Sequence, residues 1–432
     1  MDRLRAVLHV VPGMAFLAGG LLLLCAACTS PATDKQTLRF WAMGREGEVV
    51  SQLMPEFERR NPGIHVDVQQ LPWTAAHEKL LTAFAADALP DVCQLGNTWI
   101  PEFAALDALA PLNSAVAHSK IVDAADYFPG IWETNTIGPA LLGIPWYVDT
   151  RVLFYRKDLL ARAGFDHPPR SWNEWEQALA AVKREAGPGK YAILLPINEF
   201  EPLLALGLQQ RGPLLSDDGG HGRFSSPAFR RALDFYVRMF REQWAPSMQA
   251  GAISNVWTEF GRGYFSFYIS GPWNIEEFKR RMPPEHRDDW MTAPLPGPDG
   301  PGASTAGGAS LVIFRSAKRP DAAWRLIEYL SSTEVQVRFH ALTGDLPPRR
   351  DPWRDPALSG DVYAKAFLDQ LERARPTPKV PEWERIANEM QLAAEQVVAG
   401  KIDVDQATRV LDTRVDTILE KRRWMMARAK SQ

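Results

Sequence analysis

The stretch LRFWAMGREGEVVSQLMPEFERRNPGIHVDVQQ (38–70) sets the architecture of the chain. Its first five residues predict a strand, and the apolar residues that follow recur at helical spacing. The turn NPG at 61–63 ends this helix, and the alternating residues IHVDV (64–68) predict a second strand. A helix at 75–89 and a strand at 91–95 continue this order, which indicates a parallel α/β sheet with right-handed crossovers.

A second unit of the same kind begins near Val152, where LFY (153–155) predicts a strand. SWNE at 171–174 has the pattern of a capping box, in which the serine and glutamate side chains each bond a free backbone N–H. Ser226 before Pro227 marks the start of another helix. Because 432 residues exceed the ~250–300 that one hydrophobic core supports, two α/β units are the expected organisation.

The chain crosses between the two units more than once. A Gly/Pro-rich break at 297–308 precedes a strand at 311–314, and a polar, proline-rich segment follows at 344–356. From residue 382 to the end the chain is helical and charged. We expect the strand to return to the first unit and the last helices to pack on the second, with the crossings forming a hinge beside a cleft.

The composition is that of a globular protein and excludes several classes. Hydrophobic residues make up 46% and charged residues 23% of the chain, which rules out a disordered or collagenous protein. A net charge of -3 provides no basic field for a nucleic acid. Tryptophan, present 15 times, often lies on binding surfaces. Cys93 is the single cysteine of the body and forms no zinc pattern, so no metal or other cofactor is expected.

The first residues have the pattern of an export signal. Two arginines precede an uncharged segment whose apolar centre (14–24) is shorter than the ~20 residues of a membrane span. LCAAC at 24–28 resembles the bacterial lipobox, so we expect a signal peptide at 1–27 and a lipid on Cys28. Plain signal cleavage and a retained membrane anchor are the alternatives. Residues 28–37 are polar and predict a tether to a periplasmic or cell-surface body.

The body contains, in this order, the segments FWAMGREGE, PEFERRNPGIHV, ALPDVCQLGN, GIPWYVDTRVLFYRKDLL, SWNEW, YISGPWNI, GGASLVIF and LTGDLPPR. Together they resemble the extracellular carbohydrate-binding proteins of bacterial ABC importers, the maltose-binding-protein class. The resemblance implies a two-lobed α/β periplasmic-binding-protein fold that closes on a sugar and performs no catalysis. Each lobe would be a mostly parallel sheet flanked by helices, and the lobes would be joined by a hinge. It assigns 38–147 plus 305–347 to an N-lobe and 148–304 plus 348–432 to a C-lobe.

A sugar presents hydroxyls around apolar C–H faces, so its site needs aromatic rings and polar side chains. Tyr147 and Asp149 lie where the chain should cross between lobes, and the resemblance places a sugar-binding acid at Asp149. Asn97 and Thr98 follow the third predicted strand, at the sheet edge where open α/β folds hold ligands. Glu46 lies in the equivalent loop after the first strand, although a helix start there favours an acid for any ligand.

Three tryptophans are candidate stacking surfaces. Trp273 follows a Gly-Pro turn that displays its side chain, and the resemblance places a sugar-stacking indole there. Trp383 matches another stacking position of the family, at a helix start. Trp257 is a further candidate platform, upstream of an aromatic strand at 264–268 whose own rings are assigned to the core. Tryptophans that sit in other strand or helix patterns are assigned to packing: Trp41, Trp73, Trp172, Trp175 and Trp324.

Glycine and arginine complete the candidate site. Gly307 and Gly308 lack a Cβ, so the backbone there can approach a ligand or the hinge closely. Arg349, with Arg350 beside it, lies in the segment at 344–356 and either binds sugar hydroxyls or faces solvent.

The competing class is a secreted glycoside hydrolase that would use Asp149 and Glu46, since acids and aromatic rings also describe such sites. The chain has no GxSxG, HExxH or phosphate-binding loop. The resemblance favours a monomeric receptor, held at the membrane only by its lipid, that delivers a di- or oligosaccharide to an ABC permease. The many aromatic residues favour more than one sugar ring, and an α-glucoside such as maltose or trehalose is the first candidate.

Overall fold

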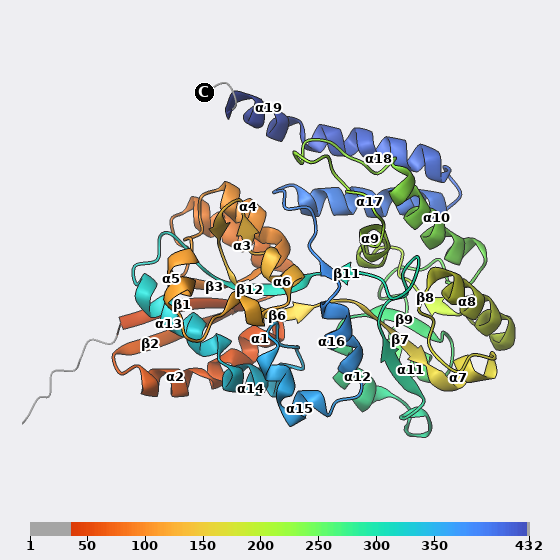
Figure 1. Cartoon of the computed structure of the whole chain (residues 1–432), viewed down its shortest axis with the longest axis horizontal. Coiled ribbons are helices and arrows are strands. Elements are labelled where there is room, and N and C mark those ends of the chain that lie inside the picture. The colour runs from red at the N-terminus through yellow and green to blue at the C-terminus, as the bar shows by residue number, and fades with distance from the viewer. Residues whose placement is uncertain (1–35, 430–432) are drawn as a thin grey trace, which may run out of the picture.

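The computed structural model describes residues 36–429, and these fold into two lobes (Figure 1). Each lobe contains a β-sheet with helices packed against it, so the expected two-lobed α/β fold is confirmed. The export signal and Cys28 lie outside the described residues. None of the helices in the described range combines the length and the apolar character that crossing a bilayer requires.

The N-lobe is built on a five-stranded sheet. In spatial order its strands are β2 (Ile64–Leu71), β1 (Gln36–Met43), β3 (Val92–Gly96), β12 (Gly307–Ile313) and β6 (Ile144–Asp149). β1 pairs in parallel with β2 and β3, as the strand–helix–strand pattern predicts. β12 lies between β3 and β6 and runs antiparallel to both. The strand predicted at 311–314 therefore does return to the first sheet.

Helices cover both faces of this sheet (Figure 1). Buried side chains of α1, α2, α13 and α14 form a core on one face, and those of α3 and α4 form a core on the other. The helix predicted after the first strand is interrupted by a 3-10 turn at Val50–Gln52 and restarts with Pro55, whose ring cannot continue a helix from within. The helices are α1 (Gly44–Val49), α2 (Met54–Arg60), α3 (Trp73–Ala85), α4 (Ile100–Ala105), α5 (Asn113–His118), α6 (Pro129–Glu133), α13 (Pro320–Ser331) and α14 (Thr333–Thr343).

The sheet of the C-lobe differs from the mostly parallel sheet that we expected. In spatial order its strands are β10 (Trp290–Ala293), β7 (Val152–Arg156), β9 (Phe267–Ser270) and β8 (Ile193–Leu194). β7 is antiparallel to both β10 and β9, and only β8 and β9 are parallel. The reason lies in α11, whose last residues accept hydrogen bonds from Arg156 at the end of β7. The chain thus re-enters the sheet at that end and runs back along β7.

Helices also flank the C-lobe sheet. The capping box at the start of α8 is confirmed, because Ser171 Oγ accepts a hydrogen bond from the Glu174 amide at 3.2 Å. The C-terminal helices α17 and α18 pack with α9 and α10 around a core that includes Trp175 and Leu411, as expected. The helices are α7 (Lys157–Arg162), α8 (Trp172–Ala186), α9 (Glu201–Leu208), α10 (Pro227–Arg241), α11 (Val256–Gly261), α12 (Asn274–Arg281), α15 (Pro356–Ser359), α16 (Lys365–Leu371), α17 (Trp383–Val398), α18 (Val404–Ile418) and α19 (Glu420–Ala429).

Three segments of the chain connect the lobes. The first leads from β6 into β7, and the second leads from β11 (Ser304–Thr305) into β12. The third follows α14 and lies beside the first, because the Val148 amide donates to the Leu346 carbonyl at 3.0 Å. β11 also pairs in parallel with β13 (Ala374–Arg375), which leads toward α17. These connections form the floor of the space between the lobes.

Candidate functional site

A cavity of about 540 Å³ lies between the two lobes. Side chains from the carboxyl ends of β1, β3 and β6 line it on the N-lobe side, and α9 and α17 contribute residues from the C-lobe. Most residues that the sequence marked as binding candidates meet there: Glu46, Asn97, Thr98, Tyr147, Asp149, Trp273, Gly307, Gly308 and Trp383. Loops that are far apart in the sequence are brought together because strands of both lobes end at this space.

Glu46 and Asp345 form a buried carboxyl pair on the N-lobe side of the cavity. They are 8% and 7% exposed and come from α1 and from the segment that follows α14. Burial raises the pKa of Glu46, and hydrogen bonds from Asp345 and Trp73 act in the opposite direction. Burial and the nearby charge of Glu46 raise the pKa of Asp345 well above its ordinary value. Burial thus raises the pKa of both carboxyl groups, so the pair retains a proton to a higher pH than exposed acids do.

Tyr147 extends this polar cluster toward the sheet. The buried Gln94 side chain donates its Nε2 hydrogen to Tyr147 Oη at 3.1 Å, and its Oε1 accepts from the Met43 amide at 2.6 Å. Burial, and then the charges of Glu46 and other acids, raise the pKa of Tyr147 well above 10.0. The phenol thus stays protonated, and its O–H can donate to a ligand.

Asp149 and Arg151 form a second polar cluster, where the first segment leaves the N-lobe. Arg151 Nε lies 3.7 Å from Asp149 Oδ1, and Arg151 Nη2 donates to Glu201 Oε1 at 3.2 Å. Enclosure raises the pKa of Asp149, and the charge of Arg151 opposes that rise. Asp149 Oδ1 has no hydrogen-bond partner among the described groups. The cluster thus offers an acceptor and a fixed cation to the hydroxyls of a ligand.

Trp273 stands at the start of α12 with 39% of its surface exposed. Its ring folds back over Gly271, where a Cβ atom would lie only 1.9 Å from the indole. Glycine is therefore required at that position, and the Gly-Pro turn fixes the ring at the cavity wall. The Arg151 guanidinium lies 4.7 Å from the centre of the ring, in a cation–π arrangement. The indole and the Asp149 cluster thus form one continuous wall.

The loop after β3 connects the N-lobe to the rest of the site. Thr98 Oγ1 donates to Glu384 Oε1, at the start of α17 in the C-lobe, at 2.6 Å. Asn97 Nδ2 donates to the Ala306 carbonyl at 2.9 Å, which ties the same loop to the residue before β12. Thr98 therefore joins the two lobes, whereas Asn97 fixes its loop to the segment that enters the N-lobe sheet.

Gly307 and Gly308 allow close contact within the hinge. They begin β12, beside Asp149 and Val148 of β6. A Cβ on Gly307 would lie 2.3 Å from the Asp149 carbonyl oxygen, and one on Gly308 would lie 2.2 Å from that of Tyr147. Gly308 also has a φ of +125°, which side chains rarely tolerate. The two glycines thus approach a neighbouring strand while also lining the cavity.

Aromatic rings cover other parts of the wall. Trp73, which we expected to be a packing residue, is 36% exposed and lines the cavity instead. It lies directly after β2, at the same edge of the sheet as Asn97, and its ring contacts Trp99 at 5.6 Å between ring centres. Trp383 lines the cavity but is only 1% exposed, and its Nε1 hydrogen has no partner among the described groups. An indole buried to this extent offers little of its face for the stacking role that the family resemblance implies.

Two sequence candidates lie away from the cavity. Trp257 packs at the edge of a C-lobe core, and its Nε1 donates to Asn274 Oδ1 at 2.7 Å. Arg349 is buried, and its Nε donates to Asp126 Oδ2 at 2.7 Å. Arg350 pairs with Glu372 at 2.8 Å. The sequence could not separate these arginines from ligand-binding ones because the acids that pair with them come from distant segments.

Several residues of the cavity wall were missing from the sequence prediction. Trp73 could have been found, because the rule that marked Asn97 applies equally to the end of β2. Asp345 lies in a predicted crossing but carries no local signal of its own. Four further aromatic or charged residues become neighbours of the site only in three dimensions: Trp99, Arg151, Glu201 and Glu384.

A group of acidic and histidine side chains outside this cavity has a different role. Ligand atoms of Asp158, His286 and Asp289 lie within 4.8 Å of one another. The Arg156 guanidinium faces them, donating to both oxygens of Asp158 at 2.8 Å and lying 3.9 Å from Asp289. A side-chain cation therefore already neutralises this group.

Two lobes with a polar and aromatic cavity between them are typical of proteins that capture small solutes. Residues 43–337 match the family of bacterial extracellular solute-binding proteins, so the chain belongs to that family. It is 60% identical to the sugar-binding protein MalE from Xanthomonas citri, with a TM-score of 0.89 over 91% of this chain and 99% of that one. The resemblance to the maltose-binding-protein class is thus confirmed.

Curated relatives cover a similar share of the chain. A lipoprotein of Streptomyces antibioticus, encoded in the oleD 5′ region, is 30% identical over 84% of this chain and 83% of its own length. The maltodextrin-binding protein MdxE of Bacillus subtilis is 23% identical over 86% of this chain and 88% of its own length.

Proposed function

We propose that the protein captures a neutral di- or oligosaccharide between its lobes and delivers it to an ABC permease. The observation that carries this proposal is the cavity wall, where the indoles of Trp73 and Trp273 stand beside the acids Glu46 and Asp149. Aromatic faces suit the C–H surfaces of sugar rings, and carboxylates accept hydrogen bonds from hydroxyls. The names of the Xanthomonas citri and Bacillus subtilis relatives support a sugar ligand.

The charges around the cavity favour a neutral sugar. The carboxyl groups that line it come from both lobes and belong to Glu46, Asp149, Glu201, Asp345 and Glu384, whereas Arg151 is the one lysine or arginine among the lining residues. Arg151 already interacts with two of these acids. A uronic acid or a sugar phosphate would place another negative charge beside them, which costs binding free energy.

The size of the cavity fits more than one sugar ring. Its volume of about 540 Å³ is in the ordinary range of small-molecule sites. Trp273 on the C-lobe side and Trp73 on the N-lobe side offer separate ring-sized faces. An α-glucoside such as maltose or trehalose is therefore the first candidate ligand.

A sugar panel tests this function directly. Thermal shift and calorimetry would be measured with maltose, trehalose, maltotriose, lactose and an acidic disaccharide. A bound sugar at 100 times its dissociation constant should raise the free energy of unfolding by about 2.7 kcal/mol. The sugar should be recovered intact, with no new reducing ends. Turnover would instead support a glycoside hydrolase that uses Asp149 and Glu46, and failure of every sugar would reject the proposal.

We further propose that the mature protein is a monomer held at the membrane by a lipid on Cys28. The apolar segment that ends in LCAAC supports this anchor, as does the lipoprotein relative in Streptomyces antibioticus. The tether would let the two lobes reach a permease in the same membrane.

A further inference from the structure

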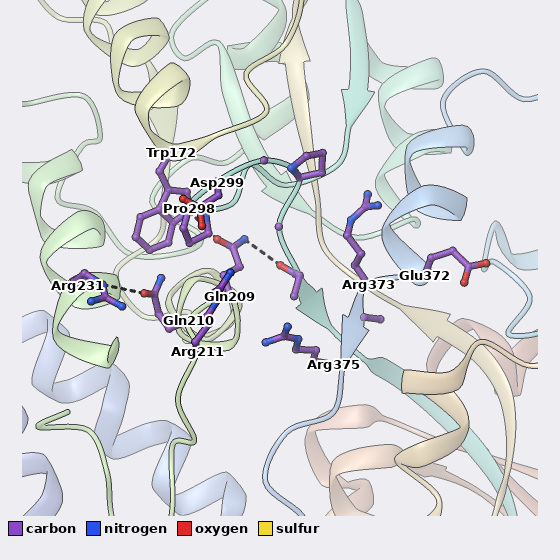
Figure 2. Close-up of a pocket in the computed structure, with 15 residues that line it drawn as sticks. Trp172, Gln209, Gln210, Arg211, Arg231, Pro298, Asp299, Glu372, Arg373 and Arg375 are labelled. Carbon is purple, nitrogen blue, oxygen red and sulfur yellow. Dashed lines mark hydrogen bonds between the residues drawn. The ribbon is translucent and has the colours of Figure 1, made fainter. Parts of the chain in front are cut away.

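A second cavity, of about 860 Å³, lies within the C-lobe (Figure 2). It is bounded by the residues that follow α9, by the loop at 298–303 and by the segment at 372–375. It shares no lining residue with the cavity between the lobes. The sugar site therefore does not account for it.

The charged side chains of this cavity are mostly arginines. Its wall contains Arg211, Arg231, Arg373 and Arg375 but only two acids. One of these acids, Glu372, pairs with Arg350 outside the cavity at 2.8 Å, and Figure 2 shows its carboxylate turned away from Arg375. Among the described residues, Arg211 and Arg231 form no ion pair, and the Nε group of Arg231 donates to the neutral Gln210 side chain. Arg373 is paired with Asp369, so Arg211, Arg231 and Arg375 are the arginines of the wall without an acidic partner in the described part of the chain, and Asp299 is the remaining acid beside them.

Gln210 supplies an independent sign that this cavity holds a ligand. The residue is 4% exposed, and its Oε1 accepts a hydrogen bond from Arg231 Nε at 3.3 Å. This contact, drawn in Figure 2, fixes the orientation of the amide. The Nε2 group is then left as a buried donor with no partner in the described part of the chain. A donor that is buried and unpaired destabilises the fold unless a ligand or water accepts from it.

The segment at 372–375, which forms another wall of the cavity, also contains a buried donor without a partner in the described structure. Arg373 donates both Nη groups to Asp369, at 3.1 and 2.8 Å, while its enclosed Nε has no partner among the described residues. On the two walls, the described buried groups without a partner, Gln210 Nε2 and Arg373 Nε, are therefore both hydrogen-bond donors. Arginine and amide donors together match the oxygens of a phosphate or a carboxylate, which can accept several such bonds at once.

We propose that this cavity is a binding site for an oxyanion, meaning a phosphate or a carboxylate group. Arg211 and Arg231 supply the charge, and Gln210 supplies a directed donor. The neighbouring Gln209 donates to the Ala303 carbonyl at 3.0 Å, next to β11, which connects the lobes. The oxyanion site is thus attached to the base of the hinge.

Calorimetric titration with inorganic phosphate and with citrate tests this site. The buffer would contain no other oxyanion, and sodium chloride would hold the ionic strength constant. We expect one molecule of phosphate or citrate to bind per chain, and the tighter of the two identifies the preferred group. Arg211→Ala and Arg231→Ala should each raise the dissociation constant at least tenfold. Arg184→Ala, an exposed arginine on α8 outside the cavity, should leave it unchanged.

Two results would overturn the proposal. One is the absence of binding by either anion at millimolar concentration. The other is an equal loss of affinity in Arg184→Ala and Arg211→Ala, which would show a general attraction of anions to the surface. Circular dichroism of each variant confirms that the comparison is made between folded proteins.

Discussion

Thr98 and Glu384, which are 286 residues apart in the sequence, share a hydrogen bond of 2.6 Å that joins the two lobes at the wall of the interlobe cavity. Thr98 belongs to the loop after β3 in the N-lobe, and Glu384 belongs to α17 in the C-lobe. A bond between a hydroxyl and a carboxylate contributes about 1.5–3 kcal/mol. Because it exists only while the lobes are close together, its free energy favours the closed arrangement.

Thr98→Val should therefore shift the protein toward an open arrangement. We expect the dissociation constant for sugar to rise about tenfold, because closure loses at least about 1.4 kcal/mol. Small-angle scattering without sugar should show a larger radius of gyration than in the wild type. Thr413→Val, on the surface of α18, is the control and should change neither quantity. Equal affinities for Thr98→Val and wild type would show that the bond does not contribute to closure.

Asp149→Ala and Trp273→Ala test the wall of the sugar site. The first variant loses charge-assisted hydrogen bonds and should weaken sugar binding roughly ten- to a hundred-fold. The second should cost at least as much, because it removes apolar area and admits water to the polar contacts nearby. Neither should change the melting temperature of the sugar-free protein. Trp424→Ala, a tryptophan with 57% exposure on α19, is the matched control.

Unchanged affinity in both variants would remove Asp149 and Trp273 from the binding site. A large fall in the melting temperature of sugar-free Trp273→Ala would instead assign this indole to packing. Calorimetric titration and a thermal melt of each protein separate these outcomes.

The buried carboxyl pair predicts a pH dependence of stability. Unfolded Asp345 loses its proton near its ordinary pKa of 3.8, whereas the folded protein retains this proton to a higher pH. The folded state thus binds more protons in this window, so the free energy of unfolding should fall as the pH rises above about 4. Asp345→Asn removes this group and should flatten the decline. Urea unfolding between pH 4 and pH 8 measures both curves.

Asp166→Asn provides the control for that experiment, because its carboxyl group is 94% exposed. Its curve should follow that of the wild type. If the Asp345→Asn curve also follows that of the wild type, Asp345 does not retain a proton above about pH 4 in the folded protein.

Gly308→Ala should lower the free energy of unfolding by more than the cost of placing a side chain at a positive φ alone. Its Cβ would lie 2.2 Å from the Tyr147 carbonyl oxygen, within the pairing of β12 and β6. Gly400 has a φ of +69°, and a Cβ there would meet no atom within 4 Å, so this residue isolates the conformational cost. We expect about 1–2 kcal/mol for Gly400→Ala and a larger loss for Gly308→Ala, both measured by urea unfolding. Equal losses of stability in the two variants would mean that β12 moves away from the Tyr147 carbonyl without a cost in free energy.

Cys28→Ser tests the lipid anchor. The substitution removes the thiol to which a lipid would be attached, so the protein should move from the membrane fraction to the soluble fraction. Mass spectrometry of the wild type should show a lipid on Cys28, the first residue once the signal peptide has been removed. Cys93→Ser, in the buried core, should not release the protein. A variant that still sediments with membranes, together with an unmodified wild type, would exclude lipidation.

The sequence predicted most of the elements because their signals are local. The alternation of 64–68 and the capping box at Ser171 depend only on neighbouring residues. Trp273 could be selected for a similar reason, since the glycine that its ring covers lies two positions before it. Strand direction in the C-lobe could not be predicted, because it depends on where α11 ends in space.

The residues of the site that escaped prediction have the same physical explanation. Arg349 is held by Asp126, and Arg151 interacts with Glu201, yet both arginines look alike in the sequence. Their partners are chosen by the packing of distant segments. Asp345 likewise meets Glu46 only after α14 has packed on the N-lobe. Periodicity and turns carry no information about such pairs.

The position of β12 also constrains how the protein can be made. β12 lies between β3 and β6, so the first sheet remains in two parts until the ribosome has added Gly307–Ile313. A nascent chain that ends earlier exposes unpaired edges on both strands, which is the condition under which chains aggregate. The N-lobe therefore cannot be isolated by truncation after β6. Its completion during synthesis must wait until every strand of the C-lobe sheet, β7 to β10, has emerged.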